Sequence, residues 1–264
     1  MIFVGKEMMN MNNDNFKIKN DILTKYIGKE KNVVIPGNIR RIGKEAFYES
    51  FVEMVIIEEG VKIIGTSAFC GCGHLTEIVL PNTLEVIEYD AFCACSNLER
   101  IVLPDSLVKI GKAPFTICDR LKEIVAGENN SAVKSSDGNL FSKDGKKLIW
   151  YQVCSEEPEY VVPDGTEIIG EAAFAYNNYI ERIVLPDGVK KICGDAFGRC
   201  KNLKEVIIPE SVNEIEDELD GLGTFSHVHP VLRMLGITPP TIRTPKGSYA
   251  EEYASAHEIP FVAI

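Results

Sequence analysis

The sequence lacks the features that would place it in a membrane or on nucleic acid. It has no run of about 20 apolar residues, the length that an α-helix needs to cross a bilayer. It has no Lys/Arg-rich run either, and its formal net charge is −11. Nucleic acids and anionic membranes are bound through basic patches that replace counterions. We therefore expect no membrane span and no nucleic-acid partner.

The amino terminus also lacks a targeting signal. Residues 1–10 contain no charged segment followed by an apolar core, so they do not have the pattern of a secretory signal. Taken literally, this predicts a cytoplasmic protein. A start inside a longer precursor would remove that expectation.

Sequence motifs of catalysis are missing as well. There is no Gly-rich phosphate loop, no G-x-S-x-G motif and no Cys-His or Ser-His pair at a recurring spacing. We therefore expect a non-enzymatic protein with no cofactor. An enzyme would have to build its site in residues 127–160 or 217–240, where the pattern described next is interrupted.

What the sequence does contain is one pattern written at least six times. A clear copy is Ile78-Val-Leu-Pro81, then Leu84-x-x-Ile87, then Ala91-Phe92-x-x-Cys95-x-x-Leu98. The proline or its replacement recurs at intervals of 22, 23, 23, 23, 36, 23 and 23 residues, at Pro36, Glu58, Pro81, Pro104, Gly127, Pro163, Pro186 and Pro209. Such a period predicts units that stack into a solenoid, because one unit cannot bury its apolar face alone.

Each copy has the same predicted parts. An L-x-x-L-x-L run alternates with period two, as a short strand with one buried face does. Proline ends the run because it cannot donate to a strand ladder. A second short run follows, and then an Ala-Phe pair in a brief helical or 3-10 turn. The phenylalanines are expected to form one aromatic stack along the core: Phe47, Phe69, Phe92, Phe115, Phe174 and Phe197.

These residues resemble the BspA-like branch of the leucine-rich repeat superfamily, whose unit reads roughly I-x-I-P-x-x-V-x-x-I-G-x-x-A-F-x-x-C-x-x-L. The resemblance extends from about Phe16 to Ile264. It implies a repeat solenoid of the right-handed β-α superhelix type, mainly β with short helical or 3-10 turns. Members of this family are mostly surface proteins of host-associated microbes, and some are adhesins for host proteins. The resemblance therefore implies a protein-binding module at the cell surface, and a cytoplasmic interaction scaffold or assembly subunit is the alternative.

Interruptions of the pattern divide the chain into five expected segments. These are an N-terminal cap hairpin (1–32), repeat units (33–126), a hairpin insertion within the array (127–160), further units (161–216) and a C-terminal loop followed by a strand-helix-strand cap (217–264). In the insertion, Asp144-Gly145 is typical of a hairpin turn. The final helix is expected to be capped by Ser248 and to share one face among four residues: Tyr249, Ala250, Tyr253 and Ala254.

The eight cysteines follow the repeat. Four of them lie three residues after the repeated Phe and are expected to form an inward row of small apolar side chains rather than a metal site: Cys72, Cys95, Cys118 and Cys200. Cys70 and Cys93 lie one residue after the Phe, nearer solvent. Rungs about 4.8 Å apart are within the Cα range of a disulfide, so bridging between neighbouring rungs stays open.

His227 and His229, with His257 as a third ligand, have a spacing that would chelate a metal ion from one strand. Pro230 and the loop-like surroundings instead favour a surface or cap position. We expect no metal site.

The residues most relevant to binding are the outward positions of the first sheet. One β-branched residue per unit forms a stripe, Ile56, Val79, Val102, Val125, Val184 and Ile207. Beside it lie charges of alternating sign, Glu77, Arg100 and Glu123, then Arg182 and Glu205, with Glu99, Lys122, Glu181 and Lys204 in a third row. Alternating charge is what in-register stacking requires for stability. The same arrangement also offers a long protein-binding surface.

Trp150 is the only tryptophan and lies in the insertion. Packing is its expected role, with an interface contact as the alternative.

Overall fold

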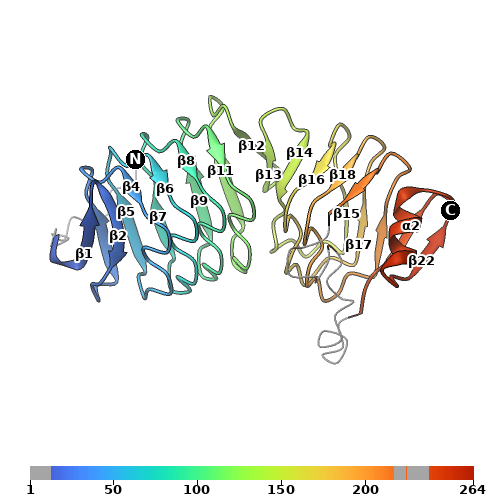
Figure 1. Cartoon of the computed structure of the whole chain (residues 1–264), viewed down its shortest axis with the longest axis horizontal. Helices are drawn as coiled ribbons and strands as arrows, with labels where there is room; N and C mark the ends of the chain where they lie inside the picture. Colours follow the sequence, from blue (N-terminus) through green and yellow to red (C-terminus); the bar gives the residue numbers. More distant parts are fainter. Residues whose placement is uncertain (1–12, 217–223, 225–237) are drawn as a thin grey trace. The chain divides into compact units, whose positions relative to one another are not determined.

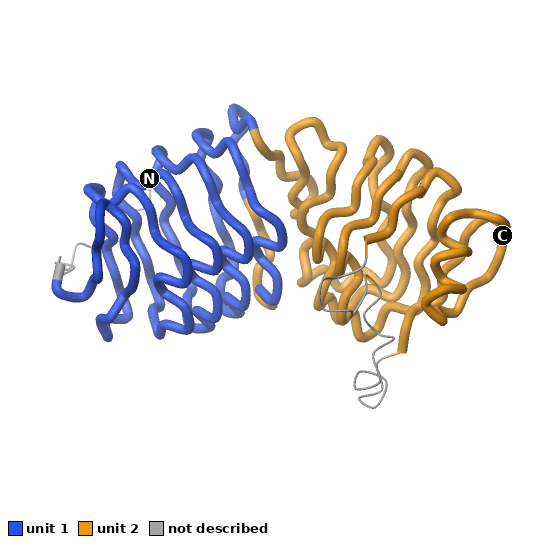
Figure 2. The backbone as a smooth tube through the Cα atoms, in the orientation of Figure 1, with its two compact units in different colours: residues 1–118, 125–131 blue, residues 119–124, 132–264 orange. Residues whose placement is uncertain are grey.

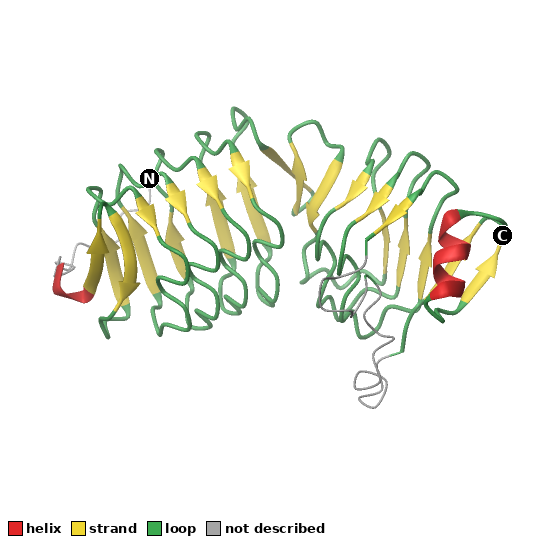
Figure 3. Cartoon of the chain, viewed as in Figure 1, coloured by secondary structure: helices red, strands yellow, loops and turns green. Residues whose placement is uncertain are grey.

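The computed structural model describes residues 13–216, 224 and 238–264. The chain forms two compact units, residues 1–118 with 125–131 and residues 119–124 with 132–264 (Figure 2). Both units repeat one kind of rung, in which a strand, a turn and a second, shorter strand follow one another (Figure 1). Regular structure in the described residues is almost entirely β, with one 3-10 helix and one α-helix (Figure 3). The fold is thus a mainly-β repeat solenoid, as the periodicity predicts.

Within the described residues, the first element of unit 1 is the 3-10 helix η1 (Asn13–Asn15). A six-stranded sheet has the order β1 (Phe16–Lys19), β2 (Ile22–Tyr26), β4 (Arg41–Ile42), β6 (Ile63–Ile64), β8 (Val86–Ile87) and β10 (Lys109–Ile110). A three-stranded sheet contains β3 (Asn32–Ile35), β5 (Met54–Ile57) and β7 (Glu77–Val79), and a two-stranded sheet contains β9 (Arg100–Leu103) and β11 (Glu123–Ala126).

The second unit has two sheets. Its six-stranded sheet has the order β12 (Val133–Ser136), β13 (Asn139–Ser142), β14 (Lys147–Trp150), β16 (Ile168–Ile169), β18 (Lys191–Ile192) and β20 (Glu214–Ile215). Its five-stranded sheet has the order β15 (Glu159–Val161), β17 (Arg182–Val184), β19 (Glu205–Ile207), β21 (Thr241–Thr244) and β22 (Phe261–Ala263). The single described α-helix is α2 (Tyr249–Ala256).

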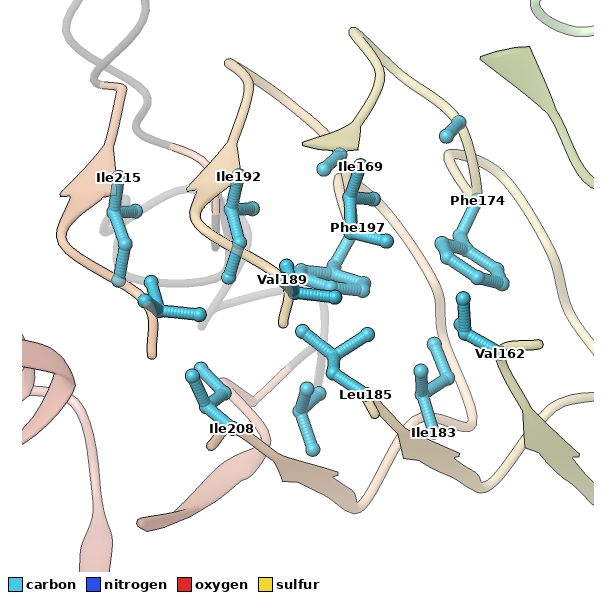
Figure 4. Close-up of a cluster of buried hydrophobic side chains, with 14 of the residues drawn as sticks. Val162, Ile169, Phe174, Ile183, Leu185, Val189, Ile192, Phe197, Ile208 and Ile215 are labelled. Carbon is cyan, nitrogen blue, oxygen red and sulfur yellow. The ribbon is translucent and has the colours of Figure 1, made fainter. Parts of the chain in front are cut away.

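Successive rungs pair in parallel and in register. Arg182, Ile183 and Val184 face Glu205, Val206 and Ile207, the residues 23 positions later. Identical repeat positions therefore lie beside one another. In unit 2, aliphatic side chains of both sheets point toward the phenylalanines between them, as Ile169 and Ile192 do from one sheet and Ile183 from the other (Figure 4).

The proline of each unit ends one strand and begins a turn. Pro81 lies two residues after the end of β7, and its carbonyl accepts a hydrogen bond of 3.2 Å from the amide of Leu84. The same bond joins Leu107 to Pro104 at 3.1 Å. Because proline has no amide hydrogen, the strand cannot extend through it, and the chain turns toward the second sheet.

The aromatic stack predicted from the sequence is confirmed within each unit. In unit 1 the ring centroids of Phe69 and Phe92 are 5.5 Å apart, and those of Phe92 and Phe115 are 5.7 Å apart. In unit 2 the distance between Phe174 and Phe197 is 5.5 Å. All six phenylalanines are at most 1% exposed. Offset stacking of buried rings adds to the gain from removing them from water.

Tyrosines continue both stacks. The ring of Tyr26 lies 4.9 Å from that of Phe47, and the ring of Tyr151 lies 5.1 Å from that of Phe174. Both tyrosines belong to segments outside the regular pattern, which is why the spacing of phenylalanines did not reveal them.

The Ala-Phe segment is a series of turns rather than a continuous helix. The amides of Cys70 and Cys72 donate to the carbonyls of Ser67 and Phe69, each over 3.1 Å and three residues. Ser67 and Gly71, on either side of Phe69, have φ values of 52° and 77°. A residue at positive φ interrupts a right-handed helix, and its amide is free to bond the next rung. Ladder bonds between rungs thus continue through the turns.

The inward cysteine row is also confirmed. Cys72, Cys95, Cys118 and Cys200 are 0% exposed. Each thiol donates to the phenylalanine carbonyl of the preceding rung, as Cys95 does to Phe69 at 3.2 Å and Cys200 to Phe174 at 3.0 Å. A weak donor in an apolar core thereby keeps a partner.

Antiparallel pairs occur at two places in the sequence. β1 pairs with β2 near the start of the described chain. Later β12 pairs with β13 and β13 pairs with β14, with Asp144 and Gly145 in the turn between the latter two. Parallel pairing resumes from β2 to β4 and from β14 to β16. The second strand of each hairpin thus provides the edge on which parallel rungs begin.

Near the end of the chain, Ser248 caps α2 by accepting a 3.3 Å hydrogen bond from the amide of Glu251. Ala250, Tyr253 and Ala254 are buried, but Tyr249 is 40% exposed, so it does not share their face. β22 adds a parallel strand to β21. Across the described residues, no helix combines the length and the apolar character that a membrane span requires.

Candidate protein-interaction face

The stripe proposed from the sequence lies on the outer surface of the sheets. In unit 1, β7 and β9 alternate exposed and buried residues, with Val79 and Val102 44% and 46% exposed. Ile56 and Val125, on β5 and β11, are half-buried. Because Ile56 and Val79 are direct cross-strand partners, the apolar side chains follow one another from rung to rung.

Unit 2 carries a stripe of its own. Val184 and Ile207 are half-buried cross-strand partners. Val161 on β15 precedes them in the same row and is 57% exposed. In unit 1, Val34 on β3 likewise pairs with Ile56. Val34 and Val161 were not predicted from the sequence, although each lies two residues before a repeated proline, Pro36 and Pro163.

The charged row of unit 2 forms a continuous set of ion pairs. Arg182 Nη1 lies 2.7 Å from Glu159, and Arg182 Nε lies 2.7 Å from Glu205. Glu205 also lies 3.3 Å from Arg243. In the neighbouring row Lys204 pairs with Glu181 at 2.7 Å. The charges that alternate in sign along the sequence thus form ion pairs between neighbouring rungs. In unit 1, Glu77, Glu99 and Arg100 are exposed beside the stripe. Lys122 and Glu123, which belong to unit 2, are exposed as well.

These contacts shift the ionisation of the row. Hydrogen bonds to Glu159 and then Glu205 raise the pKa of Arg182. Partial burial acts to raise the pKa of Glu205, but the hydrogen bonds from Arg182 and Arg243 outweigh it and lower that pKa below its usual value. Both groups are therefore held in their charged forms at neutral pH.

We expect Arg182→Glu to destabilise unit 2, because three glutamates would then lie side by side on β15, β17 and β19. The urea midpoint should fall at low salt, and the difference from the native protein should shrink in 1 M NaCl, where screening acts within about 3 Å. Lys204→Glu breaks one pair and should have a smaller effect. A loss that is independent of salt would contradict this account.

Trp150 lies away from the exposed face. It ends β14, is 3% exposed and faces Leu140 across the strand pair. Trp150 is therefore a packing residue, the role that the sequence favours, and its side chain is not part of the exposed stripe.

One cluster has ligand atoms close enough for a metal ion. Glu171, Cys193 and Glu216 bring one such atom each within 4.8 Å of the others. Cys193 and Glu216 occupy the same repeat position, which spacing alone could have shown. Glu216 already pairs with Lys191 and accepts a 3.3 Å bond from the amide of Gly194. Burial raises the pKa of Cys193 to about 11, so the thiol is protonated at neutral pH and a metal would have to displace its proton.

The histidine set is only partly visible. His227 and His229 lie outside the described residues, as does nearly all of the 217–240 segment. His257 is at the C-terminal end of α2, where its Nδ1 lies 2.9 Å from the carbonyl of Tyr253 and its ring stacks on that tyrosine.

Comparison with known proteins agrees with this architecture. The family model for the BspA-type leucine-rich repeat region, in six copies, matches residues 15–144 and 151–219. No match was found among curated proteins. Of the solved structures, the pneumococcal vaccine antigen PcpA is similar with a TM-score of 0.56 and 19% identity, over 89% of this chain and 79% of that one.

A leucine-rich repeat protein from Eubacterium ventriosum is similar with a TM-score of 0.65 and 19% identity, over 86% of this chain and 66% of that one. At this identity both likenesses concern the fold. Leucine-rich repeat folds are typically non-enzymatic protein-interaction modules. The chain belongs to the BspA-type leucine-rich repeat family.

Proposed function

We propose that this protein binds another protein through the exposed face of the sheets formed by the longer strand of each rung, β5, β7, β9 and β11 in the first part of the array and β15, β17 and β19 in the second. The observation that carries the proposal is the row of exposed β-branched side chains on successive rungs, with Val79 and Val102 in unit 1 and Val161 in unit 2. Outward positions of a sheet that faces only water are usually polar. An apolar row repeated at one position is instead suited to contact with a partner.

The energetics of such a contact are favourable. Covering one exposed valine side chain contributes on the order of 1 kcal/mol at about 25 cal/mol per Å². Several valines in line therefore support a specific interface. The charged rows beside them, Glu77 and Arg100 in unit 1 and Arg182 in unit 2, would fix the register of the partner and speed its association.

For the kind of partner we propose a host surface or matrix protein, with this chain acting as an adhesin at the cell surface. Family resemblance supports this choice. The alternative partner is an intracellular protein held by a cytoplasmic scaffold.

The test compares two matched changes of exposed valines. Val79→Lys with Val102→Lys places two charges in the stripe, whereas Val108→Lys places a charge at a 61% exposed valine outside it. Binding is measured to immobilised extracellular-matrix proteins and to proteins of the producing cell. The double variant should lose at least tenfold in affinity with an unchanged melting temperature, and Val108→Lys should bind normally.

Equal binding by the native protein and the double variant would contradict the site. Binding to cellular proteins but not to matrix proteins would contradict the adhesin role and support the scaffold. No binding to either set would contradict the proposed function.

A further inference from the structure

Two cysteines of unit 1 occupy the same position on adjacent rungs. Cys70 follows Phe69 and Cys93 follows Phe92, whose rings stack at 5.5 Å with an interplanar angle of 4°. The amide of Phe69 donates to the carbonyl of Ala91, and that of Gly71 donates to the carbonyl of Cys93, both at 2.8 Å. These bonds lie on either side of Cys70 and hold the two cysteines at ladder spacing, about 4.8 Å.

The two thiols lie at the same position on neighbouring rungs and are partly accessible. Both residues are half-buried, and both are free thiols. Cys72 and Cys95, two residues further along each rung, are 0% exposed and bond to carbonyls of the core. A reagent in solution therefore reaches the outer pair but not the inner pair.

We propose that Cys70 and Cys93 are a redox site at which a small disulfide, such as oxidised glutathione, cross-links two adjacent rungs reversibly. The Cys70 thiolate attacks one sulfur of the oxidant, forming a mixed disulfide and releasing one glutathione thiolate. Cys93 then loses its proton and attacks the Cys70 sulfur, releasing the second glutathione thiolate. Both protein thiols lose a proton, the two glutathione thiolates take up protons, and the oxidant is reduced by two electrons.

Reversibility follows from the geometry of stacked rungs. A Cα spacing of about 4.8 Å lies within the range found for disulfides, 4.4 to 6.8 Å. In-register parallel neighbours, however, keep their Cβ atoms at nearly the same spacing, above the usual 3.5 to 4.5 Å. The bond would form under strain, and strained disulfides are reduced more easily.

The surroundings make the reaction dependent on pH. Burial raises the pKa of Cys70, the neighbouring Cys93 thiol acts to lower it, and the carboxylates of Asp90, Glu49 and Glu45 raise it further. Burial, Cys70, Asp90 and Cys118 raise the pKa of Cys93. Because the thiolate is the attacking species, cross-linking should be slow at pH 7 and faster at pH 9.

The experiment exposes the native full chain to oxidised glutathione at pH 8.5, blocks remaining thiols with N-ethylmaleimide and digests it with a glutamate-specific protease. Mass spectrometry without reduction should find residues 60–77 linked to residues 89–99, and dithiothreitol should release them. Cys70→Ser and Cys93→Ser should each abolish the link and leave one glutathione on the remaining thiol. Cys154→Ser, at another half-buried thiol, should keep the link.

Three results would overturn the proposal. The first is N-ethylmaleimide on both thiols after oxidation. The second is a separate glutathione on each thiol with no link between the peptides. The third is a link that persists in Cys70→Ser. A more rapid reaction at pH 7 than at pH 9 would contradict the assigned attacking group.

Discussion

Phe92→Ala should lower the free energy of unfolding by about 3–5 kcal/mol, the usual cost of removing a buried aromatic side chain. Phe92 is 0% exposed and stacks between Phe69 and Phe115 at 5.5 and 5.7 Å. Its removal leaves a cavity and breaks two ring contacts at once. Urea unfolding followed by circular dichroism measures the change.

The matched control is Phe51→Ala, which removes the same side chain at a 74% exposed position. Phe51 contacts only the ring of His74 among the aromatic groups described, at 5.4 Å. Its loss should change stability by no more than about 0.5 kcal/mol. Similar stability losses for the two variants would show that the aromatic stack does not stabilise unit 1.

Gly60→Ala should be the second most damaging change. Gly60 has a φ of +116°, a conformation that costs an L-residue about 1–3 kcal/mol. A Cβ at Gly60 would also lie 2.1 Å from the carbonyl oxygen of Gly37 on the preceding rung. Moving that backbone adds a further ~1–3 kcal/mol of overpacking.

Gly188→Ala separates the two causes. Gly188 occupies the same repeat position and has a φ of +107°, but a Cβ there would meet nothing within 4 Å. It should therefore show the conformational cost alone. Thermal unfolding of both variants measures the difference, and an equal loss at the two glycines would contradict the close approach of rungs at Gly60.

The sequence predicts the core well because identical repeat positions are stacked in register. Once the period is known, Phe92 and Cys95 must lie beside their counterparts 23 residues away, and the structure confirms both rows. Residues outside the regular repeat are harder to place from the sequence. Tyr26, the last residue of a hairpin strand, and Tyr151, the residue after one, continue the aromatic stacks at places where the period gives no alignment.

For the candidate site, alternation along each strand identifies the outward residues but not how far neighbours cover them. Val102 is 46% exposed, whereas Ile56 and Val184, at the same repeat position, are half-buried. Their exposure depends on the side chains of adjacent rungs, which vary from unit to unit. The alternating signs of Arg182 and Glu205 were sufficient to anticipate an ion pair, because the register places them side by side. Glu159, which pairs with Arg182 from the preceding rung, was not identified from the sequence.

Contact of the sheet face with a partner protein can be tested directly. Replacing Val102 with the photoreactive residue p-benzoylphenylalanine, and Val108 in a separate chain, allows both surfaces to be cross-linked to the same partner under ultraviolet light. We expect a covalent adduct from position 102 and none from position 108. An adduct from position 108 alone, or equal adducts from both, would contradict the claim.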